Sequence, residues 1–362
     1  MMLQNHRNSR RSINHEKRAF ERDDAPRDDG CSTAIPSPDL LYRKAASHAR
    51  QLFLVTGGCG FIGSHLTEAL VARGDVVRVL DDLSHGKREN LPRGVEFIEG
   101  DLADPVALRR AIQDVDGCFH LAAVSSIAEC HARWLDAHRI NLTGTISVFD
   151  AARRGRHDAP VPVVYASSAA VYGEQGAIAL SESLMPRPIS AAGADKAGCE
   201  LHAKIAQVMH RVPTIGLRFF NVYGPRQDTV SPHAAAVPNF CRGLADRRPI
   251  SLFGDGGQLR DFVYVKDAVA ALLAAMDHGS RQAEIFNVCT GRGVTVAALA
   301  QTIARIVGVT REIDHRPARP SDMRHALGDP ARAHDALGIE ASTDLETGLR
   351  LTLKSYAAAG VV

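Results

Sequence analysis

The sequence has no pair of cysteines at the spacing of a redox or metal motif. Its seven cysteines form no CxxC pair, and no cluster of cysteine and histidine has the short spacing of a zinc site. We therefore predict reduced thiols and no metal centre. Long apolar runs are also missing: none approaches the roughly 20 residues that span a bilayer, and the first 30 residues have no apolar segment typical of a secretory signal. We expect no membrane association and a cytoplasmic location.

A strong excess of one charge is absent as well. Lysine and arginine number 43 against 41 aspartate and glutamate residues, which gives a formal net charge of +2. This balance argues against nucleic acid as a partner, because its binding usually needs a broad positive field. With 362 residues, 45% of them hydrophobic, the chain can bury the core of one large domain or two smaller ones.

The first 50 residues differ in character from the rest. Arginines alternate there with aspartates and glutamates, without an apolar period. We interpret residues 1–50 as a disordered charged extension. The alternative is that its basic beginning contacts an acidic surface.

From Leu52 onward, short β-branched runs alternate with longer helical stretches. The strand-like runs are LFLVT, VVRVLDD, VEFIEG, CFHLAA, VPVVYASS and TIGLRFFNV. This alternation predicts an α/β fold with a doubly wound parallel sheet and helices on both faces. After Pro225 the regularity fades, which predicts a smaller C-terminal lobe. We assign to the sheet domain residues 51–225 and a returning segment at about 258–290, and to the lobe residues 226–257 and 291–362.

The segment TGGCGFIGSHL lies between the first strand and the first helix of this pattern. In that context Gly57 allows a tight turn, Gly60 lets backbone N–H groups approach a pyrophosphate, and Gly63 allows close packing of the helix. The helix, which begins with Phe61 and Ile62, favours phosphate at its N-terminus. The motif predicts a Rossmann dinucleotide site, whereas a glycine-rich turn that binds nothing is the alternative.

The second strand ends in two carboxylates, Asp81 and Asp82, which follow Gly57 by 24 and 25 positions. A carboxylate there accepts hydrogen bonds from the adenosine ribose and repels a 2′-phosphate, so NAD is favoured over NADP. Lys87 and Arg88 in the next loop keep NADP as an alternative.

The next two strands also end in candidate cofactor residues. GDLAD places Asp101 and Leu102 after the third strand, and HLAA places Ala122 and Ala123 after the fourth. Ligands in such sheets bind outside the carboxyl ends of the strands, so we expect these residues beside the cofactor.

Several motifs in register resemble one known family. TGGCGFIGSHL, DDLSHGK, GDLAD, HLAA, YASSAAVYG, LRFFNVYGPRQ and GDGGQLRDFVYV occur in the order seen in UDP-galactose 4-epimerase-like proteins. The resemblance covers residues 52 to about 350. The chain thus resembles the NAD-dependent nucleotide-sugar epimerase/dehydratase branch of the extended short-chain dehydrogenases/reductases, which implies a Rossmann fold, NAD and a UDP-sugar substrate.

The resemblance implies a role for Ser168 in YASSAAVYG, because the family's active-site serine or threonine hydrogen-bonds the sugar hydroxyl that is oxidised. A strand that merely ends in serines is the alternative. Related dehydratases resemble a version with Asp-Glu or Glu after this position, which here holds Ala169 and Ala170. Dehydration is therefore disfavoured.

The resemblance also implies the residues that hold the sugar nucleotide. They are Asn221 in RFFNVYGPRQ, Arg260 in QLRDFVYV, and Arg319 with Asp322 in RPARPSD. Arginine suits a diphosphate because its planar guanidinium forms bidentate, charge-assisted hydrogen bonds. A solvated surface charge is the alternative for either arginine.

The sequence departs from the family at the expected Tyr-x-x-x-Lys pair. The lysine is Lys196, but the position four residues earlier, in ISAAGADK, is Ala192. On a helix these positions share a face, so the ammonium would stabilise a phenolate. Without the tyrosine, we expect turnover to lose the roughly 10²–10⁴-fold typical of general acid–base catalysis.

Three functions follow as hypotheses. The first is an NAD-dependent UDP-sugar 4-epimerase that lacks its usual base and either is impaired or uses a relocated one, such as a water held by Ser168 and Lys196. The second is a catalytically silent homologue that binds NAD and a sugar nucleotide. The third and weakest is a nucleotide-sugar dehydratase or 4-reductase. The resemblance also implies a homodimer, paired through the helices around Asn141 and Lys196.

Overall fold

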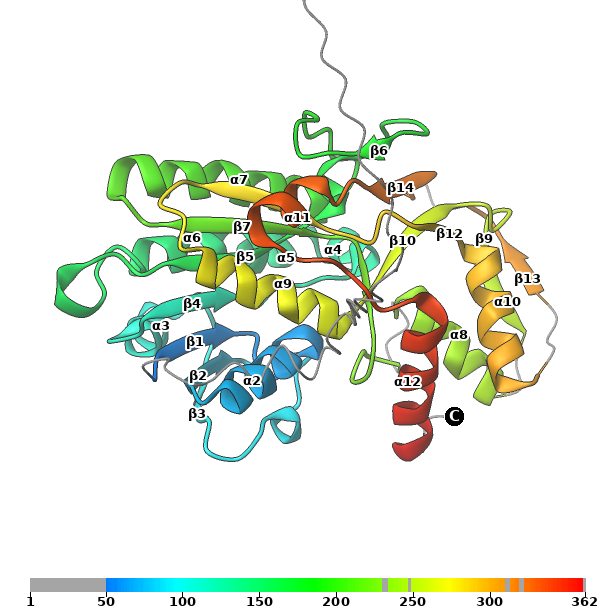
Figure 1. Ribbon diagram of the computed structural model, residues 1–362, viewed down its shortest axis with the longest axis horizontal. Coiled ribbons are helices and arrows are strands. Elements are labelled where there is room, and N and C mark those ends of the chain that lie inside the picture. Colours follow the sequence, from blue (N-terminus) through cyan, green and yellow to red (C-terminus); the bar gives the residue numbers. More distant parts are fainter. Residues whose placement is uncertain (1–49, 230–233, 247–248, 310–312, 319–321, 361–362) are drawn as a thin grey trace, which may run out of the picture. The chain divides into compact units, whose positions relative to one another are not determined.

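The computed structural model describes residues 50–229, 234–246, 249–309, 313–318 and 322–360 (Figure 1). The predicted charged extension, except for Arg50, lies outside the described residues. Within the described part of the chain, no helix is both long enough and apolar enough to cross a membrane.

The largest element is a parallel sheet of seven strands in the order β11-β7-β5-β4-β1-β2-β3. Its strands are nearly free of exposed residues, as expected of a parallel sheet covered on both faces. The strand order reverses between β1 and β4, and a crevice for ligands forms at such a point. The fold class predicted from the alternating pattern is confirmed. The strands are β1 (Leu52–Thr56), β2 (Val76–Asp81), β3 (Glu96–Glu99), β4 (Gly117–His120), β5 (Val163–Ser168), β7 (Thr214–Phe219) and β11 (Glu284–Val288).

Helices cover both faces of this sheet (Figure 1). On one face α2 (Phe61–Arg73) packs against α9 (Val265–His278), and on the other α6 (Gly144–Ala151) packs against α3 (Pro105–Ile112) and α7 (Ala191–His210). Successive residues of β1 point to opposite faces, so Leu54 and Val55 belong to two different hydrophobic clusters. Between β4 and α6 lie α4 (Ile127–Ala132), α5 (Trp134–His138) and the π-helical turn η2 (Arg139–Thr143).

A second region, at the right of Figure 1, contains the smaller sheets. A five-stranded sheet has the order β12-β10-β14-β6, with β8 paired to β10, and β9 pairs with β13. The helices α8, α10 and α12 share a hydrophobic cluster with these strands. The elements are β6 (Ala179–Leu180), β8 (Asn221–Tyr223), β9 (Ile250–Phe253), β10 (Leu259–Tyr264), β12 (Gly293–Thr295), β13 (Ile313–Arg316), β14 (His325–Gly328), α8 (Ala236–Ala245), α10 (Val296–Val307) and α12 (Leu345–Ala358). The helix α11 (Ala331–Leu337) instead packs against β11 of the large sheet and against α9.

Candidate functional site

The glycine-rich turn between β1 and α2 has no room for side chains at two positions. Gly57 has a φ of +70°, and a Cβ there would lie 2.7 Å from the backbone nitrogen of Ala122. A Cβ on Gly63 would overlap the carbonyl oxygen of Gly57. Gly60 caps the helix that starts with Phe61, and the first turn of α2 carries no acidic residue. The helix N-terminus is therefore free to favour a phosphate.

The two carboxylates after β2 have different environments. Asp81 is buried and accepts hydrogen bonds of 2.9 Å from the backbone nitrogens of Cys59 and Leu83, so it braces the glycine turn. Burial raises the pKa of Asp81. Asp82 is exposed and accepts from the backbone and hydroxyl of Ser84. Asp81 is thus the carboxylate in direct contact with the turn.

The basic residues of the next loop are not equally available for a 2′-phosphate. The guanidinium of Arg88 lies over the ring of Phe97, 3.9 Å from its centroid, and Lys87 is exposed. Stacking of this kind holds an arginine in place. The arrangement, with a buried carboxylate at the strand end, suits the ribose of NAD.

The residues expected after β3 and β4 lie at the same edge as the glycine turn. Asp101 is exposed and accepts from the backbone of Ala103 at 2.9 Å, while Leu102 is buried. Ala122 and Ala123 are half-buried just after β4, and the backbone of Ala122 forms the wall against Gly57. The structure therefore brings the predicted cofactor residues to the carboxyl edge of the sheet.

Ser168 and Lys196 come from β5 and α7, which pack against each other. Ser168 is the last residue of β5, and its hydroxyl accepts from the backbone of Ala170 at 3.1 Å. Lys196 is only 9% exposed, and within the described residues it forms no hydrogen bond or ion pair. The helix begins at a cap in which the hydroxyl of Ser190 accepts from the backbone of Gly193. The cap fixes the start of α7, and Lys196 is the sixth residue of the helix.

Ala192 lies one turn before Lys196 on α7. It is 8% exposed and packs in a small apolar cluster with Val124, Cys130 and Ala137. A methyl group in this cluster cannot donate or accept a proton. The position therefore contributes packing and no acid–base group.

The described tyrosines do not replace the missing one, because each is buried elsewhere. Tyr165 is enclosed in the core beneath α7, and burial raises its pKa. The hydroxyl of Tyr172 donates to Asn287 at 2.7 Å, and burial raises its pKa to about 12. Tyr223 donates to a backbone carbonyl. A buried phenol held in its neutral form is a poor base.

A buried charge network that the sequence analysis missed lies behind Ser168. Glu200, on α7, accepts from the hydroxyl of Ser167 at 2.6 Å and from Nε and Nη2 of Arg218 at 2.8 and 2.7 Å. The Arg218 guanidinium also lies 4.6 Å from the ring centroid of Tyr172. An arginine inside the apolar run TIGLRFFNV was the available signal, because a charge in a buried strand needs a partner. The network ties β5 and β7 to α7.

The predicted sugar-nucleotide residues come from the second region. Arg260, on β10, forms an ion pair with Asp322 and donates to the carbonyl of Leu259 at 2.8 Å. Asn221 is exposed on β8, which pairs with β10 in register. The structure thus joins Arg260 and Asp322 and places Asn221 on the neighbouring strand. Arg319 lies outside the described residues.

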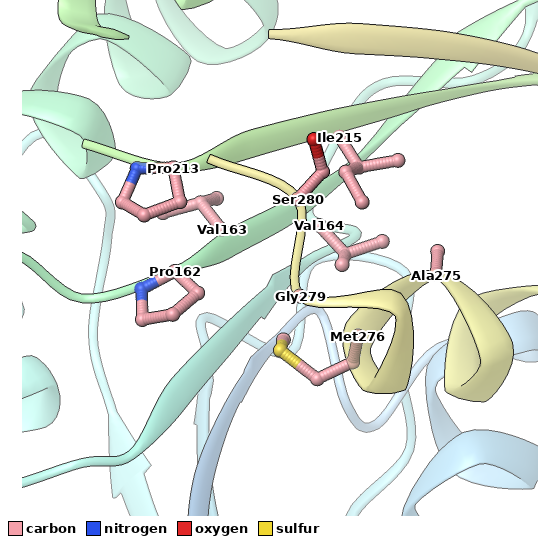
Figure 2. A pocket seen from close by; sticks show the side chains of 9 residues that line it. All are labelled: Pro162, Val163, Val164, Pro213, Ile215, Ala275, Met276, Gly279 and Ser280. Atoms are coloured by element: carbon pink, nitrogen blue, oxygen red, sulfur yellow. The ribbon is translucent and has the colours of Figure 1, made fainter. Parts of the chain in front are cut away.

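The pocket drawn in Figure 2 is not the ligand site. It is lined by the beginnings of β5 and β7, with Pro162 and Pro213, and by the end of α9, with Met276 and Gly279. Its volume is about 10 Å³, which is enough for one water at most. It lies at the amino end of these strands, opposite the edge that carries Ser168.

The described residues offer no group of histidine, cysteine, aspartate and glutamate that could hold a metal ion. The six cysteines among them are buried free thiols.

Comparisons with known proteins agree with this geometry. A model described as the NAD dependent epimerase/dehydratase family matches residues 53–289. A UDP-glucose 4-epimerase of Mycolicibacterium smegmatis is 34% identical over 316 residues, which cover 84% of this chain and 97% of that protein. A UDP-N-acetyl-alpha-D-glucosaminuronate decarboxylase of Bacillus cytotoxicus is 32% identical over 272 residues, which cover 73% of this chain and 83% of that protein. The crystal structure of a UDP-glucose 4-epimerase of Thermotoga maritima, with UDP-glucose, has a TM-score of 0.81 and 34% identity, and the match covers 85% of this chain and 99% of that one.

The cradle at Gly57 and Gly63, the open N-terminus of α2 and the carboxylate of Asp81 fit NAD. The family model covers most of the chain, and the relatives are matched over most of their own length. This chain belongs to the NAD-dependent epimerase/dehydratase family.

Proposed function

We propose that this protein epimerises a UDP-sugar at C4 through a transient 4-keto intermediate. The observation that carries the proposal is that β5, which ends in Ser168 at the sheet edge that holds the glycine turn, packs against α7, which carries Lys196. Bound NAD supplies the reversible oxidation and reduction of the sugar carbon. The epimerase relatives support this reaction, whereas the decarboxylase relative shows that family membership alone does not decide it.

In this proposal each residue has a separate task. Ser168 hydrogen-bonds the sugar hydroxyl, and Lys196 binds the nicotinamide ribose. Arg260 and Asn221 hold the diphosphate, with Arg319 as a further candidate and Asp322 orienting Arg260. The cofactor side consists of Gly57, Gly60, Phe61, Ile62, Gly63, Asp81, Asp82, Asp101, Leu102, Ala122 and Ala123.

We propose that the two ligands bind to different predicted domains. We assign the cofactor to residues 51–225 with the returning segment at about 258–290, and the sugar nucleotide to residues 226–257 and 291–362, together with Asn221 and Arg260, whose strands β8 and β10 belong to the smaller sheet. The placement of β11 in the large sheet and of β12 and β14 in the smaller one supports this division.

The proton of the sugar hydroxyl has no side-chain acceptor at Ala192. A water held between Ser168 and Lys196 is the substitute that we propose. Unaided water is a weak base, so turnover should be slower than that of a tyrosine-bearing relative by about 10²–10⁴-fold.

The test is to incubate the purified chain separately with UDP-glucose, UDP-galactose and their N-acetylated forms and to separate the C4 epimers chromatographically. We expect slow interconversion that disappears in the Ser168→Ala variant. Interconversion that persists in that variant, or its complete absence from a chain that holds NAD, would reject the proposal.

The second candidate is a catalytically silent protein that binds NAD and a sugar nucleotide. Ala192 favours it, because the alanine completes an apolar cluster and supplies no acid–base group. Bound NAD and UDP-sugar without interconversion would establish it. A dehydratase is less favoured, because Ala169 and Ala170 are buried alanines where elimination needs an acid. A 4-reductase in the same fold is the other, weaker alternative.

We also propose a homodimer through α5 and α7. These helices contact each other and expose large apolar side chains, at Trp134 (68% exposed) and Leu135 on α5 and at Leu201, Ile205 and Val208 on α7. An apolar face of this kind is typical of an interface. Trp134 is the only tryptophan of the chain, so its emission reports on the interface. A monomer by light scattering at micromolar concentration would refute the dimer, whereas Leu201→Glu should separate a dimer and shift the emission to the red.

A further inference from the structure

His120 is buried at the end of β4, beneath the sheet edge that carries the glycine turn. It is the last residue of β4 and is 2% exposed. Its Nδ1 lies 2.7 Å from the hydroxyl of Thr56, and its Nε2 lies 2.9 Å from the hydroxyl of Thr145. Both ring nitrogens are therefore engaged with side chains from two different elements.

The neighbouring bonds fix the direction of these hydrogen bonds. The hydroxyl of Thr145 donates to the carbonyl of Asn141 at 2.6 Å. Its single proton is thereby used, so it accepts from His120, whose Nε2 carries the hydrogen. The backbone N–H of Ala122 donates to the hydroxyl of Thr56 at 3.4 Å, and Thr56 can then donate to Nδ1. All four bonds run in one direction, from Ala122 to Asn141.

The imidazole is neutral in this chain of bonds. Burial, with a further contribution from the positive charge of Lys196, lowers the pKa of His120 to about 3. A protonated ring would donate from both nitrogens and reverse the bond to Thr56. The low pKa removes this possibility over the physiological range.

The chain of bonds joins two parts of the active site. At one end Thr56 precedes Gly57, and Ala122 forms the wall of the glycine turn. At the other end Asn141 belongs to the π-helical turn η2, and its carbonyl also accepts from the thiol of Cys199 at 3.2 Å. Cys199 is on α7, three residues after Lys196. A π-turn is an uncommon interruption of a helix and often occurs at functional sites.

We propose that His120, as the neutral Nε2–H tautomer, is a positioning residue that sets the glycine turn and the Lys196 segment of α7 in register for NAD. It does not touch the cofactor, and it acts through Thr56 and Thr145. The proposal concerns cofactor binding, so it does not depend on whether this chain turns over a sugar.

The first test compares two threonine variants of the intact chain. Thr145→Val keeps the branched shape and removes the hydroxyl that His120 needs, while Thr143→Val makes the same change two positions earlier, at the exposed last residue of η2. We expect the Kd for NADH, measured by fluorescence titration, to rise by about threefold to tenfold in Thr145→Val only. Thr145→Ser should restore it. An unchanged Kd in a folded Thr145→Val protein would overturn the proposal.

The second test does not use Thr145→Val, so it stands even if that variant fails to fold. Nitrogen NMR of ¹⁵N-histidine-labelled protein distinguishes a protonated from an unprotonated ring nitrogen. We expect one histidine with the hydrogen on Nε2 that does not titrate between pH 5 and 8 and keeps this form when NADH is added. Assignment of His120, by loss of its signals in His120→Asn, to an Nδ1–H tautomer or to a ring that titrates near pH 6.5 would overturn the proposal.

Discussion

Between β1 and α2 the glycines that the backbone requires are in place, whereas one turn before Lys196 on α7 the chain has an alanine. The two regions flank the same sheet edge, where we propose that NAD binds. In the first, Gly57 and Gly63 are demanded by backbone contacts, so the fold itself depends on them. In the second, a methyl group satisfies the packing, so the fold is indifferent to the lost chemistry. The comparison therefore separates the glycine turn, proposed to bind NAD, from position 192, which would have to supply the acid–base group.

The largest expected effect is a gain of function at α7. Ala192→Tyr places a phenol one turn before Lys196, where the ammonium favours the phenolate. We expect C4 interconversion to rise by about 10²–10⁴-fold in kcat, measured with the UDP-sugar that the wild-type protein turns over or binds.

The matched control is Ala192→Phe, which adds the same ring without the hydroxyl. Both rings must fit beside Val124 and Cys130, so both should change the melting temperature alike. Equal activity of the two variants would show that the comparison between the two regions is wrong, because the missing proton acceptor would then not limit the rate.

The second largest effect concerns the support of α7. Glu200→Gln keeps the shape of the side chain but leaves the buried Arg218 without its counter-ion. Breaking a buried ion pair in this way typically costs about 3–5 kcal/mol, so we expect that loss in the free energy of unfolding by denaturant titration. Glu346→Gln is the control, because Glu346 pairs with Arg305 and Arg350 on the surface and its loss should matter little. Equal losses in the free energy of unfolding of the two variants would show that the pair of Glu200 with Arg218 does not stabilise α7.

The third effect tests the backbone demand at the glycine turn. A methyl group at Gly63 meets the carbonyl oxygen of Gly57, and one of the two segments must move. We expect Gly63→Ala to lower the free energy of unfolding by about 1–3 kcal/mol and to weaken NAD binding in the same sample. Gly243→Ala, inside α8 with no atom closer than 3.8 Å, should instead be neutral or stabilising. If Gly63→Ala bound NAD as tightly as the wild-type protein, the turn would not require glycine at this position.

The same contrast explains how far the sequence alone could predict the molecule. The sheet and the glycine turn follow from local patterns of strands and glycines, and the missing tyrosine at Ala192 follows from the resemblance to the family. The resemblance proposed Arg260 and Asp322 separately, and the structure joins them in an ion pair. The hydrogen bonds from Ser167 to Glu200 and from His120 to Thr145 were not predicted. They join residues that are 33 and 25 positions apart in the sequence, and only the fold determines that these side chains point toward each other.

The smallest expected effect distinguishes two roles of Asp81. Its carboxylate both braces the glycine turn and is available to the ribose of NAD, so Asp81→Asn should weaken NAD binding by about tenfold, the value of one charge-assisted hydrogen bond.

In the absence of cofactor, the same substitution should instead gain stability relative to wild type as the pH rises. Burial raises the pKa of Asp81, so the folded state binds its proton more tightly than the unfolded state, and wild-type stability falls as the pH rises from the unfolded pKa near 3.8 through the folded one. Denaturant titrations of the NAD-free proteins should therefore show Asp81→Asn gaining stability relative to wild type between pH 4 and 7. A gap that is constant over this range would mean that the folded state does not hold the Asp81 proton, and the carboxylate would then serve the cofactor alone.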